Sequence, residues 1–239
     1  MSSYQALAKF YERFTDKDCD YDCWSQYLFG QLVGDKFQKG VDLACGTGKM
    51  TRLLAKGGLD VIGMDASAEM LAEAVSRGGK CRYVRGDLKN FALPRPVSFL
   101  TVVNDGVNYL SQGELAEFFR RASDNLISGG KLIFDLSSPF KLREVVGNNV
   151  FYYDDEDVTC LWCNKLCQDS VAMELTIFEK DGETYRRFDE RHVQYIHETE
   201  VVLKLLDEAG FETETCDCYD QSKAVCSTTQ RTTFAATKK

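Results

Sequence analysis

The chain has 239 residues, enough for one α/β domain with a full core and a modest insertion. It carries 29 lysines and arginines against 37 aspartates and glutamates, which gives a net charge of −8 at pH 7. Because nucleic-acid binders normally carry a basic stripe, this balance argues against an RNA or DNA partner. No stretch approaches the roughly 18 apolar residues of a membrane span, and no signal peptide is recognised. We therefore expect a cytoplasmic protein with no membrane association.

The ten cysteines would suit a disulfide framework only in a small secreted chain, so we expect reduced thiols. Six of them lie close together in two groups, which raises the alternative of a zinc site: Cys160, Cys163 and Cys167, then Cys216, Cys218 and Cys226. The paired spacing of two CxxC knuckles is missing from both groups. We predict that these thiols pack as small apolar side chains and that the protein holds no metal.

The first half of the chain reads as helices and then as alternating strands and helices. Apolar residues at helical spacing predict one helix from Tyr4 to Phe14 and a second from Trp24 to Leu32. Buried strands are then predicted at 41–44, 60–64, 81–84, 99–103 and 131–136, and helices at 49–56, 67–77 and 111–126. The last helix begins with a capping-box pattern at Ser111 and ends at Gly129 and Gly130. This alternation predicts an α/β fold with a doubly wound parallel sheet.

The pattern changes after Ser137. Four strands separated by turn residues are predicted at 150–153, 158–166, 170–179 and 183–195, which indicates an inserted antiparallel sheet. A helix follows at 199–209, and closing strands are predicted at 211–219 and 228–236.

Residues 41–48 (VDLACGTG) form a glycine-rich loop that we expect to bind a ligand. Glycines let the backbone approach a ligand closely, and the following helix offers free N–H groups. Thr51 stands where dinucleotide enzymes have a third glycine. Asp65 follows the second predicted strand directly, and a carboxylate there can accept hydrogen bonds from both ribose hydroxyls of an adenosine. Asp87 follows the third strand. Its carboxylate can accept a hydrogen bond from the exocyclic amine of adenine, and the Leu88 N–H can face a ring nitrogen.

Together with residues 64–67 (MDAS) and 86–87 (GD), the loop resembles the first three cofactor motifs of the class I methyltransferases, which depend on S-adenosylmethionine. Ala44 stands where the first glycine is commoner. Residues 104–110 (NDGVNYL) sit where the fourth motif of that family follows its fourth strand. Residues 21–24, 138–142 and 187–192 look like a bacterial subgroup that methylates small molecules.

The resemblance implies a seven-stranded, mostly parallel Rossmann-like sheet built from residues 1–137 and 197–239. Residues 1–34 would form a helical lid, and the inserted antiparallel sheet within residues 138–196 would cap the substrate. The implied cofactor is S-adenosylmethionine, and the implied partner is a small-molecule acceptor methylated on nitrogen or oxygen. 

The same resemblance assigns roles to individual residues. The methionine part of the cofactor would be lined by Asp42, Ala44, Cys45 and Gly46, with Asn104 approaching it from the fourth strand. Asp65 would hold the ribose, Ala66 and Met70 would lie against the adenine, and Asp87 and Leu88 would read the adenine edge. Tyr11, Tyr21 and Trp24 would form a lid over the sulfonium. Simpler roles remain open: Asp65 and Asp87 as helix caps, Met70 as helix core, and the aromatic residues as ordinary packing.

A sulfonium is already an activated methyl donor, so the protein mainly positions and desolvates the acceptor. A hydroxyl or a protonated amine would also require a base. The catalytic candidates are Asp105 after the fourth strand, Tyr109 one turn later, and His192. By strand alternation, His192 shares its face with Glu190 and Gln194, and His197 falls on the opposite face. Asp105 as a turn cap and His192 as a structural residue are the alternatives.

Three rival functions follow from the same motifs. An NAD-dependent oxidoreductase is disfavoured by Thr51. Enzymes that methylate base amines typically carry a proline pair in the fourth motif, which residues 104–107 (NDGV) lack, so an RNA methyltransferase is also disfavoured. A non-catalytic, regulatory adenosylmethionine-binding protein stays open, because binding motifs do not prove turnover.

Overall fold

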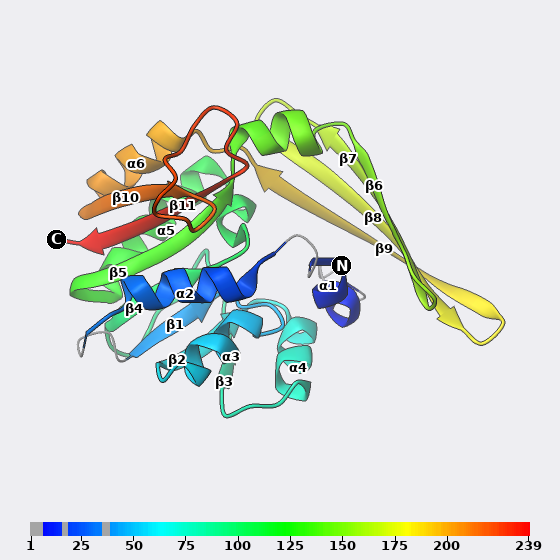
Figure 1. The fold of residues 1–239 in the computed structure, drawn as a ribbon, viewed down its shortest axis with the longest axis horizontal. Coiled ribbons are helices and arrows are strands. Elements are labelled where there is room, and N and C mark those ends of the chain that lie inside the picture. Colours follow the sequence, from blue (N-terminus) through cyan, green and yellow to red (C-terminus); the bar gives the residue numbers. More distant parts are fainter. Residues whose placement is uncertain (1–6, 16–18, 35–38) are drawn as a thin grey trace.

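A seven-stranded sheet forms the centre of the molecule (Figure 1). The computed structural model describes residues 7–15, 19–34 and 39–239. The strand order in the sheet is β10-β11-β5-β4-β1-β2-β3. The strands are β1 (Lys39–Leu43), β2 (Asp60–Asp65), β3 (Arg82–Arg85), β4 (Val97–Val102), β5 (Leu126–Ser137), β10 (Phe211–Asp217) and β11 (Arg231–Lys238). The first five pair in parallel and the last two pair antiparallel, which confirms the predicted mostly parallel sheet.

Helices cover both faces of this sheet, as its buried apolar strands require. The helices are α2 (Tyr21–Gln31), α3 (Lys49–Lys56), α4 (Ala68–Ser76), α5 (Gln112–Asp124) and α6 (Thr199–Glu208), and a short 3-10 helix η1 (Gly106–Tyr109) follows β4. Side chains of α5 and α6 pack into one core cluster, and side chains of α2 and α3 pack into another. The two clusters pack against the strands and so position the carboxyl ends of β1, β2 and β4.

The start of the fifth helix follows its sequence signal and its end does not. Ser111 and Glu114 form the predicted capping box. The helix ends at Asp124 rather than at Leu126, and β5 already begins at Leu126. Gly129 and Gly130 therefore lie within a strand and do not end the helix. The pairing of β4 with β5 is irregular there, so the glycines accommodate a distorted strand rather than a helix cap.

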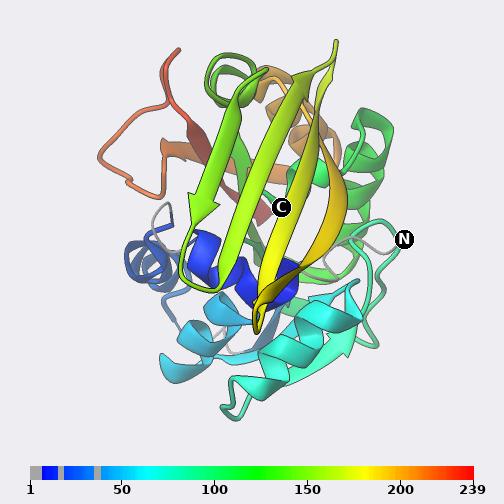
Figure 2. The ribbon, with the colours of Figure 1, turned by 90° about the vertical axis from the view of Figure 1, so that its right-hand side faces the viewer.

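A separate four-stranded antiparallel sheet lies between β5 and α6 in the sequence. Its strands are β6 (Val150–Asp154), β7 (Val158–Leu166), β8 (Ser170–Asp181) and β9 (Thr184–Tyr195), in that order across the sheet. A π-helix, η2 (Lys141–Val146), leads into it. Figure 2 shows this sheet facing the viewer with α1 (Leu7–Thr15) behind it. Leu7 and Phe10 of α1 pack into the apolar face of the sheet.

Three further expectations need correction or fall outside the description. His197 lies beyond the end of β9 at Tyr195, so it does not occupy the opposite face of that strand; its Nε2–H donates a hydrogen bond to the Leu110 carbonyl oxygen. The closing strands span 211–217 and 231–238 rather than 211–219 and 228–236. Tyr4, the expected start of the first helix, lies outside the described residues.

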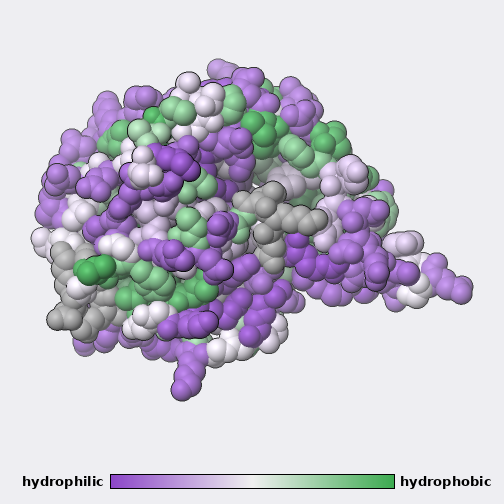
Figure 3. All heavy atoms as spheres, viewed as in Figure 1, coloured by the Kyte–Doolittle hydropathy of each residue, from purple (hydrophilic) through white to green (hydrophobic). Residues whose placement is uncertain are grey.

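The surface is largely polar. Hydrophilic residues cover most of the face in Figure 3, and apolar residues gather in smaller patches. Within the described residues, no helix has the length and apolar character needed to span a bilayer. Over the same residues, no three histidine, cysteine, aspartate or glutamate side chains are grouped so that they could share a metal ion.

Candidate functional site

The loop from β1 to α3 adopts the left-handed backbone conformations that its glycines permit. Gly46 has φ 54° and Gly48 has φ 72°. A Cβ atom added to Gly48 would lie 2.4 Å from the Tyr83 hydroxyl oxygen, so the position has no room for a side chain. Ala44 is also left-handed, with φ 51°, which is costly for a residue with a Cβ. The backbone therefore turns sharply at the carboxyl end of β1.

Asp42, the last polar residue of β1, is buried beneath this loop. Its two carboxylate oxygens accept hydrogen bonds from the Thr51 hydroxyl at 2.6 Å and the Thr101 hydroxyl at 2.8 Å. Burial raises the pKa of Asp42 to about 6, although both hydroxyls favour the charged form. Sequence reasoning treated Thr51 only as a missing glycine; its hydroxyl is a direct support of Asp42.

We expect this carboxyl to make folding stability depend on pH. The raised folded pKa of about 6, against an ordinary value of 3.8, means that the folded state holds the proton over this range and the unfolded chain releases it. The contribution of protonated Asp42 to folding stability is fully present below pH 3.8 and is lost as the pH rises through about 6. Relative to Asp42→Asn, the wild type should lose about 2–3 kcal/mol in free energy of unfolding between about pH 4 and pH 7. Urea unfolding at several pH values measures this difference.

The exposed Asp124 supplies the matched control, since Asp124→Asn should leave the pH dependence of the wild type unchanged. A wild type and an Asp42→Asn variant with parallel stability curves would contradict the prediction.

Asp65 lies at the end of β2 and faces the glycine loop. Its carboxylate accepts hydrogen bonds from the Gly46 N–H and the Ser67 N–H, both at 2.8 Å. Burial raises its pKa, and these backbone donors oppose the rise. Ser67, not Asp65, is the N-cap of α4, because its hydroxyl accepts from the Met70 N–H. Asp65 therefore ties the loop after β1 to the loop after β2, at the edge where the sequence placed a ribose.

The remaining residues predicted to contact adenine lie farther along the same edge. Asp87 accepts a hydrogen bond from the Lys89 N–H at 3.0 Å, Leu88 is buried in the core, and Ala66 is exposed. Met70 is buried on α4, with its sulfur 3.9 Å from the place that a Cβ on Gly46 would take.

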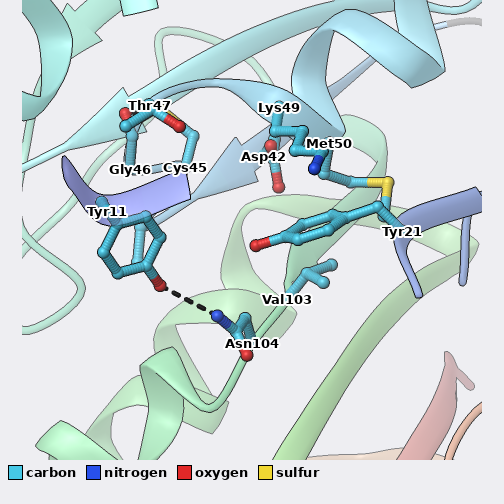
Figure 4. A pocket seen from close by; sticks show the side chains of 11 residues that line it. Tyr11, Tyr21, Asp42, Cys45, Gly46, Thr47, Lys49, Met50, Val103 and Asn104 are labelled. Carbon is cyan, nitrogen blue, oxygen red and sulfur yellow. Dashed lines mark hydrogen bonds between the residues drawn. The ribbon is translucent and has the colours of Figure 1, made fainter. Parts of the chain in front are cut away.

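An open pocket lies between the glycine loop, β4 and the two N-terminal helices (Figure 4). Its lining combines seven of the predicted cofactor residues with four that were not predicted: Tyr11, Tyr21, Asp42, Ala44, Cys45, Gly46 and Asn104, then Thr47, Lys49, Met50 and Val103. Figure 4 shows the Tyr11 ring opposite Asn104 and the Tyr21 ring between Asp42 and Val103. The ammonium of Lys49 lies 4.6 Å from the centre of the Tyr21 ring. Trp24, Asp65, Ala66, Met70, Asp87 and Leu88 are not among the lining residues.

Trp24 belongs to the core rather than to the pocket wall. It is 1% exposed and its ring stacks on Tyr219 with 4.9 Å between centroids. The guanidinium of Arg231 lies 4.8 Å from the centre of the same ring. Of the three aromatic residues expected to cover the sulfonium, only Tyr11 and Tyr21 reach the pocket, because the Trp24 side chain projects from α2 into the core beside the central sheet.

The segment after β4 carries a strained turn. Asn104 and Asp105 are both left-handed, with φ 65° and 53°. Their N–H groups donate to the Asp135 carboxylate at 2.6 and 3.0 Å, so a buried acid of β5 holds the turn. The Asn104 amide nitrogen donates to the Tyr11 hydroxyl at 2.9 Å. The sequence held one signal for this role. Asp135 is the one charged side chain toward the end of a predicted apolar strand, and a buried charge there needs a partner.

Helix α1 links the glycine loop to the four-stranded sheet. Its Glu12 accepts from the Thr47 hydroxyl at 2.6 Å and pairs with Arg52 at 3.2 Å and Arg77 at 3.0 Å. On its other side, Arg13 pairs with Asp155 at 2.6 Å. The helix thereby places Tyr11 over the pocket.

A second polar region lies between the fourth motif and the inner face of the four-stranded sheet. Gln194 donates to the Asp105 carboxylate at 2.5 Å. His192 lies 3.2 Å from the Glu190 carboxylate, and its ring is edge-on to Tyr109 with 6.1 Å between centroids. Tyr109 and His192 are therefore neighbours, and Asp105 contacts Gln194, two residues farther along β9. The predicted shared face of Glu190, His192 and Gln194 matches these contacts.

The charge state of Asp105 follows from its surroundings. Burial alone would raise its pKa, but Arg231, Lys141 and the Gln194 hydrogen bond together lower it below the ordinary value. Asp105 is thus a carboxylate at neutral pH. Lys141, at the start of η2, has a lowered pKa because it is buried and lies near Arg231.

Comparison with known proteins agrees with this geometry. The methyltransferase-domain family model matches residues 41–130. YqeM of Bacillus subtilis, whose name assigns it provisionally to the methyltransferases, is 32% identical over 218 residues, which cover 87% of this chain and 86% of that protein. A solved S-adenosylmethionine-dependent methyltransferase from Clostridium acetobutylicum is 34% identical, covers 98% of each chain and superposes with a TM-score of 0.87. The chain belongs to the S-adenosylmethionine-dependent methyltransferases. The sugar N-methyltransferase KedS8 from a Streptoalloteichus species shares the fold, with 19% identity, 100% of this chain and 94% of that chain covered, and a TM-score of 0.82.

The site of this methyltransferase fits its cofactor. S-Adenosylmethionine carries a cationic ammonium and sulfonium, and the pocket wall offers the Asp42 carboxylate and the Tyr11 and Tyr21 rings. Its ribose needs a hydrogen-bond acceptor, and Asp65 lies beside the loop. Gly46 lines the pocket, and because it has no Cβ its backbone lets a ligand approach closely.

Proposed function

We propose that this methyltransferase transfers a methyl group to an amine nitrogen of a small polar acceptor. The acceptor would lie between the turn at Asn104–Asp105 and the inner face of β9. The observation that carries the proposal is the Asp105 carboxylate, which is half-buried, charged and next to the pocket residue Asn104. A fixed carboxylate at that place suits an amine, which presents N–H donors and is cationic in solution. The fold shared with the sugar N-methyltransferase KedS8 supports the same choice.

In this mechanism the bound cofactor supplies an activated methyl group on sulfur. Asp42, Asp65 and the glycine loop hold the cofactor, and Tyr11 and Tyr21 exclude water from its reacting end. Asp105 accepts an N–H of the acceptor and directs the nitrogen lone pair toward the methyl carbon. His192, which lies 3.2 Å from the Glu190 carboxylate, would take the proton that an ammonium must lose before it attacks.

The test is a transfer assay with labelled S-adenosylmethionine and a panel of small amines matched with the corresponding alcohols. We expect label to enter amines and not alcohols, and S-adenosylhomocysteine to form in equal amount. Transfer to alcohols alone would overturn the choice of nitrogen.

Asp105→Asn should slow transfer by about a hundredfold, because the amide cannot supply the charge that holds an amine. The affinity for S-adenosylhomocysteine should stay within about threefold, since that ligand has no amine at this place. Steady-state kinetics and calorimetry measure the two quantities. Asp189→Asn, on the outward face of β9 and 58% exposed at its side chain, is the matched control and should leave both unchanged. An Asp105→Asn variant that transfers methyl groups at the wild-type rate would contradict the proposal.

A further inference from the structure

Arg231 is a buried cation at the start of β11 that sequence reasoning did not single out. It is 7% exposed, and β11 pairs with β5, which places it beside the end of the strand that carries Asp135. Its guanidinium forms a short ion pair with Asp135 and lies 3.4 Å from Asp105. It also donates to the amide oxygen of Asn104 at 3.2 Å. One guanidinium therefore contacts both residues of the strained turn and the acid that holds their backbone.

These contacts determine how the Asn104 side chain is oriented. Its amide oxygen accepts from Arg231 and from the Cys19 thiol at 3.3 Å, and its amide nitrogen donates to Tyr11. Reversing the amide would place two donor groups against each other on the Arg231 side. The Arg231 contact thus selects the orientation in which Asn104 offers its N–H groups to the pocket.

Aromatic residues hold the guanidinium in place from the other side. Trp24 stacks beneath it, and Tyr219 stacks on Trp24 while its hydroxyl donates to Asp135 at 2.6 Å. A planar guanidinium can bridge several acceptors and stack at the same time, and a lysine ammonium cannot. The arrangement is therefore specific for arginine.

We propose that Arg231 is a positioning residue for methyl transfer: through Asp135 and Asn104 it fixes the turn that faces the reacting end of the cofactor. Two left-handed residues in succession would relax to other conformations if their N–H acceptor moved. Asp135 stays in place because Arg231 neutralises and orients it. The proposal concerns the methyl-transfer site itself and holds whichever acceptor atom is used.

The test compares two cofactor analogues and needs no acceptor. Sinefungin carries an amine where the donor methyl lies, and S-adenosylhomocysteine carries nothing there. In Arg231→Lys, which keeps the charge, sinefungin affinity should fall by about tenfold while S-adenosylhomocysteine affinity stays within about threefold. Arg82→Lys, at an exposed ion pair with Asp60 on the edge of the sheet, is the matched control and should change neither. Equal losses for both analogues, or no loss for either, would show a merely structural role and overturn the proposal.

A second variant decides the question if Arg231→Lys does not fold. Arg231→Met combined with Asp135→Asn removes both buried charges together, which avoids leaving one unpaired. We expect the same selective loss of sinefungin binding and faster hydrogen exchange at the Asn104 and Asp105 amides. Unchanged exchange at these two amides with an unchanged ratio of affinities would overturn the proposal.

Discussion

Replacing Asp65 with alanine is expected to weaken binding of S-adenosylhomocysteine by at least about a hundredfold. A carboxylate that accepts two hydroxyl donors contributes about 1.5–3 kcal/mol for each charge-assisted hydrogen bond, and alanine removes both. Asp65 also holds the Gly46 and Ser67 amides, so its loss frees the glycine loop from the end of β2. Isothermal titration calorimetry measures the change in affinity.

Asp60→Ala, at the exposed opposite end of the same strand, is the control and should bind with wild-type affinity. An Asp65→Ala protein that unfolds at the wild-type temperature and binds S-adenosylhomocysteine within about threefold of wild type would contradict the ribose role.

Replacing Asp135 with alanine is expected to lower the free energy of unfolding by about 3–5 kcal/mol, because it leaves Arg231 buried without its main counter-charge. The same change removes the acceptor of two backbone N–H groups and of the Tyr219 hydroxyl. A loss of this size is a large part of the about 5–15 kcal/mol that holds a typical domain folded. Urea unfolding followed by circular dichroism measures it.

The comparison for this variant is Asp207→Ala, which removes an exposed ion pair with Lys239 and should cost less than about 1 kcal/mol. If Asp135→Ala lowers the free energy of unfolding no more than Asp207→Ala does, the buried contacts of Asp135 do not stabilise the fold as predicted.

Part of the pocket wall was predictable because it depends on chain-local patterns: Asp42, Ala44, Cys45 and Gly46 line the pocket as expected. Asp42 lies near the end of the first strand, Asp65 ends the second and Asp87 follows the third, and parallel strands bring their carboxyl ends to one edge whatever the details of packing. Gly46 and Gly48 mark the left-handed turn directly, since few other residues adopt it. The same local logic gave the four antiparallel strands and the shared face of Glu190 and His192.

Side-chain direction was less predictable where several packings satisfy the same spacing. Trp24 and Tyr21 belong to one helix and share an aromatic character, yet one lies in the core and the other lines the pocket. The helical period gives the face of a residue only relative to its own helix. Which neighbour that face meets depends on how α2 docks against the central sheet and Tyr219.

By itself, the sequence determined the fold class and the acids at the strand ends, because both follow from local spacing and strand order; the cofactor followed from the resemblance of the motifs to those of the class I methyltransferases. Only the tertiary structure decided what supports the fourth motif. Asp105, Asp135 and Arg231 are far apart in the chain, and they meet because β5 lies between β4 and β11 in the sheet. The sequence around a charged residue at a strand end does not indicate which distant residue pairs with it. Burial makes the pairing necessary, since an isolated charge in the core would be too costly to keep.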